Sequence, residues 1–310
     1  MGSAGRQSLM LMALKQTIRR IVRKPCRNIN WLDGAIALIL LLAGLWLASR
    51  LHIGVAYQWR WHEAFDLLFT PGPHGELPYF FSGLLTTLRI ALLGMVLALL
   101  LGTALGVAAF SRRPWLVMPA TLFIQLIRNL PPLVFIFIFY FFIANQLLPA
   151  SGLSRWLGTV SLSPWQEALF GPPARWENLI SGTLCVGMIS AAFVAEIVRA
   201  GLAAIPRGQW EAAQSLGLSP WVRLRHVILP QAMLLMLPPL TGQLIALVKD
   251  TAIVSLISVQ ELTFVGTEMA NSSGLVYEIW LLVAAAYLFI CLSLFVLLSR
   301  LEARQGARTC

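Results

Sequence analysis

The segment Ile90–Ala109, IALLGMVLALLLGTALGVAA, holds twenty consecutive residues without a charged side chain. About twenty apolar residues in a helix are needed to cross the hydrocarbon core of a bilayer. Gly102 and Gly106, four residues apart in this segment, predict close packing against another helix. Of all 310 residues, 58% are hydrophobic and only 12% are charged, and the mean hydropathy is +0.77. A soluble globule cannot bury so much apolar surface, so the sequence predicts an all-α polytopic membrane protein and excludes an ordinary soluble enzyme.

Apolar runs on either side of this segment predict further membrane-spanning helices, six in total. The other five cover residues 34–49, 130–148, 179–195, 231–248 and 279–299. The first run follows a basic stretch and could also be the apolar region of a signal peptide. It is long for one, and no small-residue cleavage site follows it, so we expect a retained span. The apolar stretch 115–127 either lies along the cytoplasmic interface or extends the third span.

The positively charged residues are concentrated in alternate loops. With the amino terminus inside, the cytoplasmic segments hold sixteen Lys and Arg residues and the outer loops hold three. Because positively charged loops stay on the cytoplasmic side, we expect both termini in the cytoplasm. The net charge of +10 therefore reflects membrane orientation and does not indicate nucleic-acid binding. The four cysteines and four histidines are too widely spaced to predict a disulfide framework or a metal site, and we expect no cofactor.

The longest cytoplasmic loop, residues 201–230, is the most informative stretch for function. The residues before Gly217 favour a helix, and Gly217 stands where a left-handed residue ends one. Ser219 and Pro220 suit the N-cap and first turn of a second helix, and we expect Pro230 to close that helix. Two short helices joined at a glycine form a compact knob. From its physics alone, this knob is either a solvated loop or a docking surface for a partner.

A defined motif lies in this loop. It resembles the EAA loop of ABC-importer permeases, E-A-A-x3-G-x9-I-x-L-P, with Val227 in place of the isoleucine. Six of the seven defined positions match, and they are Glu211, Ala212, Ala213, Gly217, Leu229 and Pro230. The resemblance implies that the knob fits into a groove on a separate ATP-binding subunit and transmits the motion driven by ATP hydrolysis to the spans.

Other segments are similar to the polar amino-acid permeases of this family. They read TTLR at 86–89, RNLPPL at 128–133, EIVRAG at 196–201, IPRGQ at 205–209 and KDT at 249–251. The resemblance implies the MetI-like transmembrane fold of type-I ABC importers over residues 82–300. The preceding residues 1–81 are then an extension with a basic tail, an extra helix and an outer loop, and residues 301–310 are a cytoplasmic tail.

The same resemblance implies the function and the partners. It implies a permease subunit that imports amino acids, polar ones by family, across a bacterial inner membrane. Its partners would be a pair of ABC ATPase subunits, a second permease that is identical or related, a periplasmic solute-binding protein and membrane lipid. The chain has three lysines and none follows a glycine, so it lacks the phosphate-binding motif of transport ATPases. We therefore expect no catalytic residues here and ATP hydrolysis by a partner.

Charged residues near the spans are candidates for the translocation path or its gate, because ionisable groups at membrane depth are costly. The candidates are Arg89, Arg128, Lys249 and Asp250. We expect Lys249 and Asp250 near the outer end of the fifth span. There they either contact a substrate that carries both charges or brace the loop. The apolar stretch 251–259 that follows is too short to cross again, and we expect a re-entrant or interfacial segment.

Two other classes of function remain as alternatives. A self-contained secondary transporter or channel for small polar solutes would place more charges at the middle of its spans, and these spans are nearly free of charge. An intramembrane enzyme would need acid–base or nucleophilic groups that converge at depth. No histidine lies in a predicted span. The pattern therefore favours the importer subunit, with the transporter or channel as the alternative.

Overall fold

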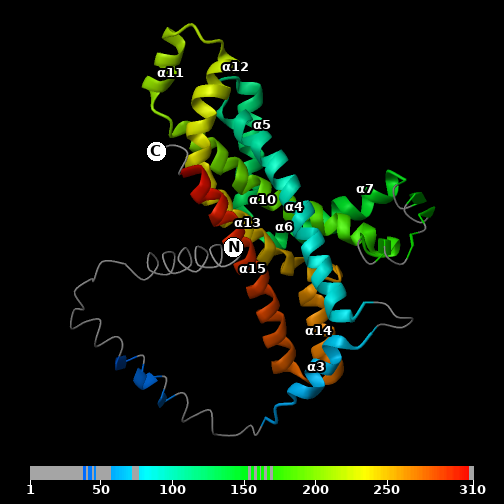
Figure 1. Ribbon diagram of the computed structural model, residues 1–310. Helices are drawn as coiled ribbons and strands as arrows, with labels where there is room; N and C mark the ends of the chain where they lie inside the picture. Colours follow the sequence, from blue (N-terminus) through cyan, green and yellow to red (C-terminus); the bar gives the residue numbers. More distant parts are fainter. Residues whose placement is uncertain are drawn as a thin grey trace, which may run out of the picture. The chain divides into compact units, whose positions relative to one another are not determined.

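The computed structural model of the chain describes residues 57–71, 77–152 and 171–306, with short stretches between 38 and 46 and between 155 and 170. The chain divides into two compact units, residues 1–59 and 60–310. In the first unit, the described residues between 38 and 46 are helical. The remainder of the expected first span and the basic tail before it lie outside the described residues. The described part of the second unit is helical and holds no strand (Figure 1).

Two long helices form the centre of the second unit. Helices α4 (Tyr79–Phe110) and α10 (Trp176–Ala203) lie side by side and run in the same direction (Figure 1). Glycine allows their close contact, because a Cβ added to Gly102 would lie 2.7 Å from the Val194 side chain. A Cβ added to Gly106 would lie 2.5 Å from the carbonyl oxygen of Ala195. The close helix packing predicted from these two glycines is therefore confirmed.

Helix α5 (Pro114–Asn129) follows α4 and packs against both central helices through Ala120, Ile124 and Ile127. The stretch 115–127, whose position the sequence left open, is thus a helix packed on the bundle. It is separated from the expected third span by a bend of 113°. Pro131 and Pro132 lie at this bend, and the extended backbone of Pro131 (φ −57°, ψ 132°) ends the first helix.

Three short helical pieces follow the bend. They are α6 (Pro132–Ile138), a π-helical turn (Phe139–Ala144) and α7 (Asn145–Ala150). Helix α6 and the π-helical turn pack against α10 through Phe135 and Phe139, which are buried. The expected span 130–148 is therefore a helical segment interrupted by a wide turn.

A second long segment leads from the predicted coupling loop into the bundle. It consists of α12 (Pro220–Arg223), a π-helical turn (Leu224–Ile228), α13 (Leu229–Asp250) and a 3₁₀ turn (Thr251–Ile257). The expectation that Pro230 closes the helix is wrong, because helical structure continues from 220 to 257. The segment changes from the π-helical turn to α13 at Leu229, so Pro230 lies in the first turn of α13, where proline is tolerated. The 3₁₀ turn ends at Ser258, whose backbone is left-handed (φ 60°). The chain then continues toward the Tyr79 end of α4, where Glu261 contacts Thr87 and Val265 lies next to Gly83. The stretch 251–259 is thus a short turn within the bundle and does not reverse the direction of the chain.

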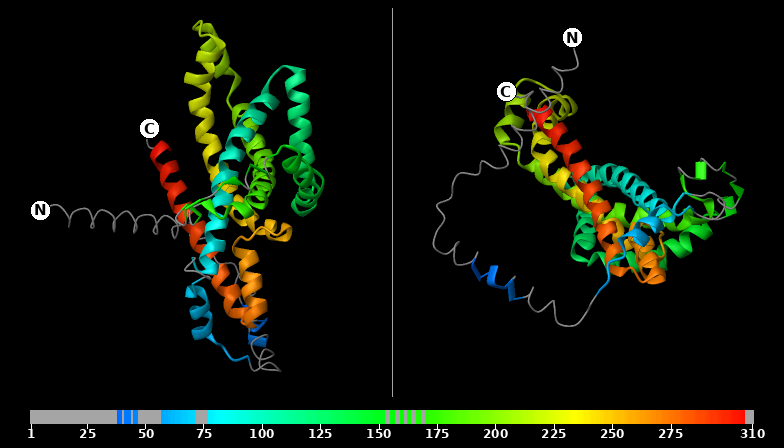
Figure 2. Two further views of the ribbon diagram at one scale, coloured as in Figure 1. Left: turned by 90° about the vertical axis from the view of Figure 1, so that its right-hand side faces the viewer. Right: turned by 60° about the horizontal axis from the view of Figure 1, so that its bottom comes forward.

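Helices α14 (Leu262–Ser273), α15 (Val276–Gly306) and α3 (Trp61–Phe69) complete the second unit. Helix α14 packs against the Tyr79 end of α4 and along α15, as the two views in Figure 2 show. Buried Ala64 and Leu68 of α3 join Phe80 and the apolar side chains of α14 and α15 in a small core. The sequence grouped residues 1–81 as an amino-terminal extension, and within it the described residues 60–71 and 77–81 belong to the second unit.

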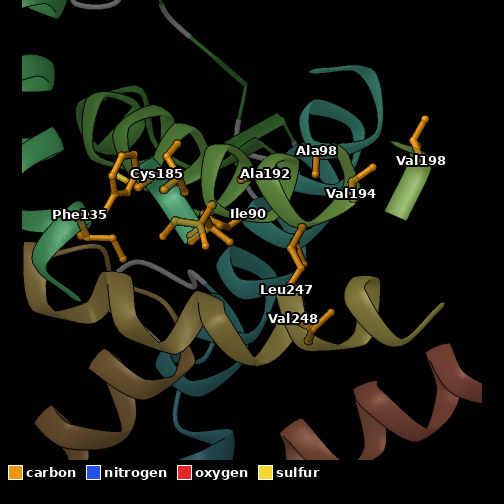
Figure 3. Close-up of a cluster of buried hydrophobic side chains, with 14 of the residues drawn as sticks. Ile90, Ala98, Phe135, Cys185, Ala192, Val194, Val198, Leu247 and Val248 are labelled. Atoms are coloured by element: carbon orange, nitrogen blue, oxygen red, sulfur yellow. The ribbon is translucent and has the colours of Figure 1, made fainter. Parts of the chain in front are cut away.

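The main core lies where α4, α10 and α13 meet. Figure 3 shows side chains from all three helices. Among them, Ile90, Cys185 and Leu247 are fully buried. The outward faces are also apolar, since Leu100 is 70% exposed and Phe289 is 74% exposed. Such faces fit a lipid environment. In the described residues, four helices are long and apolar enough to cross a membrane, or five if the bent pair counts as one span. The chain is a multi-pass membrane protein.

Candidate functional site

The predicted coupling loop folds as two short helices joined at a glycine. Helix α11 (Arg207–Ser215) ends where the amide of Leu218 donates to the carbonyl of Ala213, at 3.3 Å. Gly217 between them has φ +70°, as expected of a residue that closes a helix in the left-handed conformation. The Ser219 hydroxyl then accepts a hydrogen bond from the Val222 amide and caps α12. The expected helix end, N-cap and second helix are all present.

Trp210 and Arg223 connect this loop to the helical bundle through side-chain contacts. The Trp210 ring packs against Phe110, the last residue of α4, with 5.9 Å between ring centroids. The Arg223 guanidinium lies 6.0 Å from the Trp210 ring centroid and donates a hydrogen bond to Gln214 at 3.2 Å. These contacts link α11 to both α4 and the long segment that begins with α12.

The residues of the EAA motif occupy two faces of α11. Ala213 is only 2% exposed and packs toward the body of the protein, whereas Glu211 and Ala212 are exposed. The Glu211 carboxylate has no hydrogen bond or ion pair within the part of the chain that the structure describes. An exposed carboxylate beside a small alanine allows another surface to approach closely. The motif thus has one buried alanine and two exposed residues on α11.

A cavity of about 850 Å³ opens beside the loop. Phe110, Leu202 and Trp210 provide apolar lining, and Glu211 and three arginines also line it. The arginines are Arg112, Arg207 and Arg223. Positive groups therefore outnumber the one carboxylate in a recess large enough to take protein side chains from a partner.

Arg128 belongs to an ion-pair cluster between α5 and α10. Its guanidinium lies 3.7 Å from the Glu196 carboxylate and 5.6 Å from the centroid of the Phe193 ring. Arg199 binds the same carboxylate with two hydrogen bonds of 2.6 and 3.1 Å. The cluster ties the end of α5, just before the bend, to α10. Arg128 is thereby held at this helix contact.

Lys249 and Asp250 are the last two residues of α13. The preceding Leu247 packs close to Gly94, near the middle of the 32-residue α4. Their position near the outer end of a membrane span stays a prediction. The helical segment that carries them begins at Pro220 and not near 231. Lys249 is exposed, whereas the Asp250 side chain is half-buried at the start of the 3₁₀ turn.

Arg89 lies toward the Tyr79 end of α4. Its guanidinium donates a weak hydrogen bond to the Thr86 hydroxyl at 3.4 Å and faces Gly171 in the segment before α10. Among the described residues, no hydrogen bond or ion pair is found between any two of Arg89, Arg128, Lys249 and Asp250. The four residues thus belong to separate contacts.

The structure also shows a buried polar cluster that the sequence analysis missed. Glu261 is fully buried, and its carboxylate accepts hydrogen bonds from the Tyr287 hydroxyl at 2.7 Å and the Phe264 amide at 2.8 Å. It also accepts a longer one from Thr87 at 3.3 Å. The Thr87 hydroxyl accepts from the Leu262 amide at 3.0 Å. The cluster joins α4, α14 and α15 directly after the 3₁₀ turn. The one sequence signal was a lone carboxylate in an apolar stretch.

Comparison with known proteins gives one family. Residues 94–306 match the family described as "Binding-protein-dependent transport system inner membrane component". The chain is 31% identical over 231 residues to the glutamate/aspartate import permease protein GltK of Escherichia coli. This alignment covers 74% of this chain and 95% of GltK. It is 34% identical over 230 residues to the glutamine transport system permease protein GlnP of Escherichia coli, covering 74% and 94% of the two chains.

Two solved structures have a similar fold. One is an amino acid ABC transporter crystallised with histidines, with a TM-score of 0.58 and 30% identity over 73% of this chain and 94% of that chain. The other is the inward-facing methionine transporter MetNI, with a TM-score of 0.54 and 18% identity over 73% and 96% of the chains, a likeness of fold alone. The predicted fold class, an all-α membrane protein with the type-I importer architecture, is confirmed.

Proposed function

The chain belongs to the family of binding-protein-dependent transport system inner membrane components, and from this premise we propose that it is the permease subunit of an ATP-driven importer of polar amino acids in a bacterial inner membrane. The names of its relatives support the substrate class, since they import glutamate, aspartate or glutamine. The lack of a phosphate-binding motif in the sequence assigns ATP hydrolysis to a separate ATPase subunit.

The observation that carries this proposal is the geometry of the predicted coupling loop. Glu211 and Ala212 face outward, while Trp210 is held against Phe110 and Arg223. The exposed side fits a partner surface, and the anchored side is joined to the bundle. A solvated loop without a partner would need neither the close anchoring nor the arginine-rich cavity beside it.

The proposed mechanism follows from the helical continuity of the next segment. From Pro220 to Ile257 the chain is helical without a break, so a displacement of α11 and α12 moves α13 along its axis. This segment carries Lys249 and Asp250 to the level of the middle of α4. Closure of an ATPase pair against the loop would then change the position of these two charges in the bundle.

The charged residues near the spans are proposed to line the translocation path for the amino acid or to form its gate. Asp250 is half-buried at the end of α13, and together with Lys249 it offers both charges to a zwitterionic substrate. Arg89 lies farther along α4, toward the proposed outer side. Arg128 and its ion pair with Glu196 would keep α5 fixed to α10 near the proposed cytoplasmic side during the transport cycle.

One such chain supplies half of a translocation path in this architecture. The proposed assembly has two permeases, identical or related, two ATPase subunits and a periplasmic solute-binding protein that delivers the amino acid. Both termini lie in the cytoplasm in this arrangement, as the distribution of Lys and Arg favours. The extension 1–81 adds one span and an outer loop to a permease domain over 82–300, which ends in a short cytoplasmic tail.

Uptake in reconstituted vesicles tests the proposal. The tagged chain would be co-expressed and purified with the proposed ATPase, permease and solute-binding partners and reconstituted into vesicles. ATP-dependent uptake of radiolabelled glutamine and glutamate would then be measured. We expect uptake when ATP is supplied on the side of the ATPase subunits and no uptake with a non-hydrolysable analogue. We also expect the variant Glu211→Arg to lose this uptake. Glu63→Arg, a charge reversal of an exposed glutamate on α3, is the control. Uptake that proceeds without any ATPase would favour the self-contained transporter or channel instead.

A further inference from the structure

A small polar cavity lies at the Tyr79 end of the central helices, apart from the predicted coupling loop. It has a volume of about 60 Å³ and lies between α4, the start of α10 and the turn before α14. Its polar lining comes from all three regions and consists of Ser82, Thr86, Arg89, Arg175, Asn178 and Gln260. Two guanidinium groups and no carboxylate are found among the described lining residues. The cavity is therefore positively charged.

Two further features make this cavity suitable for an anion. The first turn of α10 lines it, and the positive end of a helix dipole favours negative charge. The carboxamide oxygen of Gln260 is buried and has no hydrogen-bond partner among the described residues. Rotation of this amide by 180° turns its N–H donors toward the same space. A carboxylate there would meet donors from the guanidinium groups, hydroxyls and amides.

The segment before α10 partly covers the cavity. Gly171 has φ +83°, and a Cβ added to it would lie 3.1 Å from Nη1 of Arg89. The loop before α10 thus covers the half-buried Arg89 side chain, while Arg175 remains exposed. A volume of about 60 Å³ admits a carboxylate group and not an entire amino acid.

We propose that this cavity binds the side-chain carboxylate of an acidic amino acid on its way to the bundle. The inference rests on the proposed transport of amino acids and narrows its substrate class. Because Gln260 directly precedes Glu261, a bound carboxylate would contact the same turn that the buried cluster joins to α4 and α15. Arrival of the substrate would in this way stabilise the turn between the 3₁₀ segment and α14.

Ligand binding to the purified full-length chain in detergent micelles tests this proposal without any ATPase. The probes are L-glutamate and L-glutamine, which have the same shape and differ in the charge of one group. At constant ionic strength, we expect L-glutamate to bind at least about tenfold more tightly than L-glutamine, as charge-assisted hydrogen bonds predict. Equal binding of the two, or no binding of L-glutamate, would overturn the proposal.

Variants connect the binding to this cavity. Arg89→Gln and Gln260→Met should each weaken L-glutamate binding by roughly ten- to a hundredfold, the effect of losing a hydrogen bond to a charged group. Gln260→Met keeps the side-chain size and remains informative if Arg89→Gln fails to fold, which size-exclusion chromatography reports. Arg113→Gln, an exposed position at the opposite end of α4, is the control and should leave binding unchanged. Unchanged binding in Gln260→Met and a folded Arg89→Gln would refute the assignment.

A third probe separates the two sources of a carboxylate. N-acetyl-L-glutamate α-amide presents the same side chain with a blocked backbone, as in a protein. We expect it to bind more weakly than L-glutamate. Equal affinity would overturn the assignment to a free amino acid and indicate an acidic side chain on a docking protein. ATP-dependent uptake of glutamine without preferential binding of glutamate would refute this inference alone, and glutamate binding without ATP-dependent uptake would refute the proposed function alone.

Discussion

Replacement of Glu261 by leucine should strongly destabilise the fold. An apolar side chain could be expected to suit this buried position better than a carboxylate, but the hydrogen bonds of Glu261 predict the opposite. The side chain is fully buried, and three hydrogen-bond donors point at its carboxylate. Leucine fills a similar volume but leaves the Phe264 amide without its acceptor and removes one acceptor from Tyr287. A buried donor without a partner costs about 1–3 kcal/mol. The two losses together predict a decrease of about 2–5 kcal/mol in the free energy of unfolding.

The contribution of the Tyr287 contact can be separated from this total. Tyr287→Phe removes one donor and should cost about 1–2 kcal/mol, because the 2.7 Å bond is made to a carboxylate. Since both variants break the same hydrogen bond, the double variant should lose about 1–2 kcal/mol less than the sum of the single variants. Phe289→Leu, 74% exposed on the same helix, is the control and should change little.

Unfolding in mixed micelles with increasing dodecyl sulfate, followed by circular dichroism, measures these differences. The reasoning predicts a lower midpoint for Glu261→Leu than for Tyr287→Phe, and a wild-type midpoint for Phe289→Leu. A stability of Glu261→Leu equal to that of the wild type would refute it. Strict additivity of the two substitutions would show that the carboxylate and the hydroxyl do not stabilise each other.

Substitutions at three further positions have expected outcomes in the same micelle assay or in uptake. Gly106→Leu should lower the stability by about 1–3 kcal/mol, because its Cβ would lie 2.5 Å from a backbone oxygen of α10; a wild-type midpoint would contradict the close helix contact. Gly217→Ala should reduce uptake and Gly217→Asn should largely retain it, since alanine resists the left-handed backbone and asparagine accepts it; equal uptake by the two would show that this conformation is not required. Arg128→Ala should cost at most about 1 kcal/mol, because Glu196 keeps its closer bonds to Arg199; a much larger loss of stability would mean that the cluster depends on Arg128.

Local features of this protein could be read from the sequence. The left-handed Gly217 and the cap at Ser219 depend on residues within a few positions of each other, and both are present in the structure. The contact at Gly102 and Gly106 was likewise signalled by their spacing on one helix. In each case the signal and its structural consequence lie in the same short segment.

Features that depend on distant segments could not be predicted in this way. Glu261 is explained by Thr87, 174 residues earlier, and by Tyr287 on another helix. The sequence suggested a helix end at Pro230, but the helical segment continues from Pro220 to Ile257 and packs against α4 and α10. The cavity around Arg89 combines three segments whose proximity only the fold creates.

Affinity purification of the tagged full-length chain in mild detergent, with partners identified by mass spectrometry, tests the central claim most directly. The account predicts that an ATPase with a phosphate-binding motif co-purifies with the wild-type chain and with the Glu63→Arg control. It also predicts that this ATPase is lost in Glu211→Arg while the amount of the chain in the membrane is unchanged. Recovery of the chain without any ATPase, under conditions that keep a known importer intact, would contradict the account.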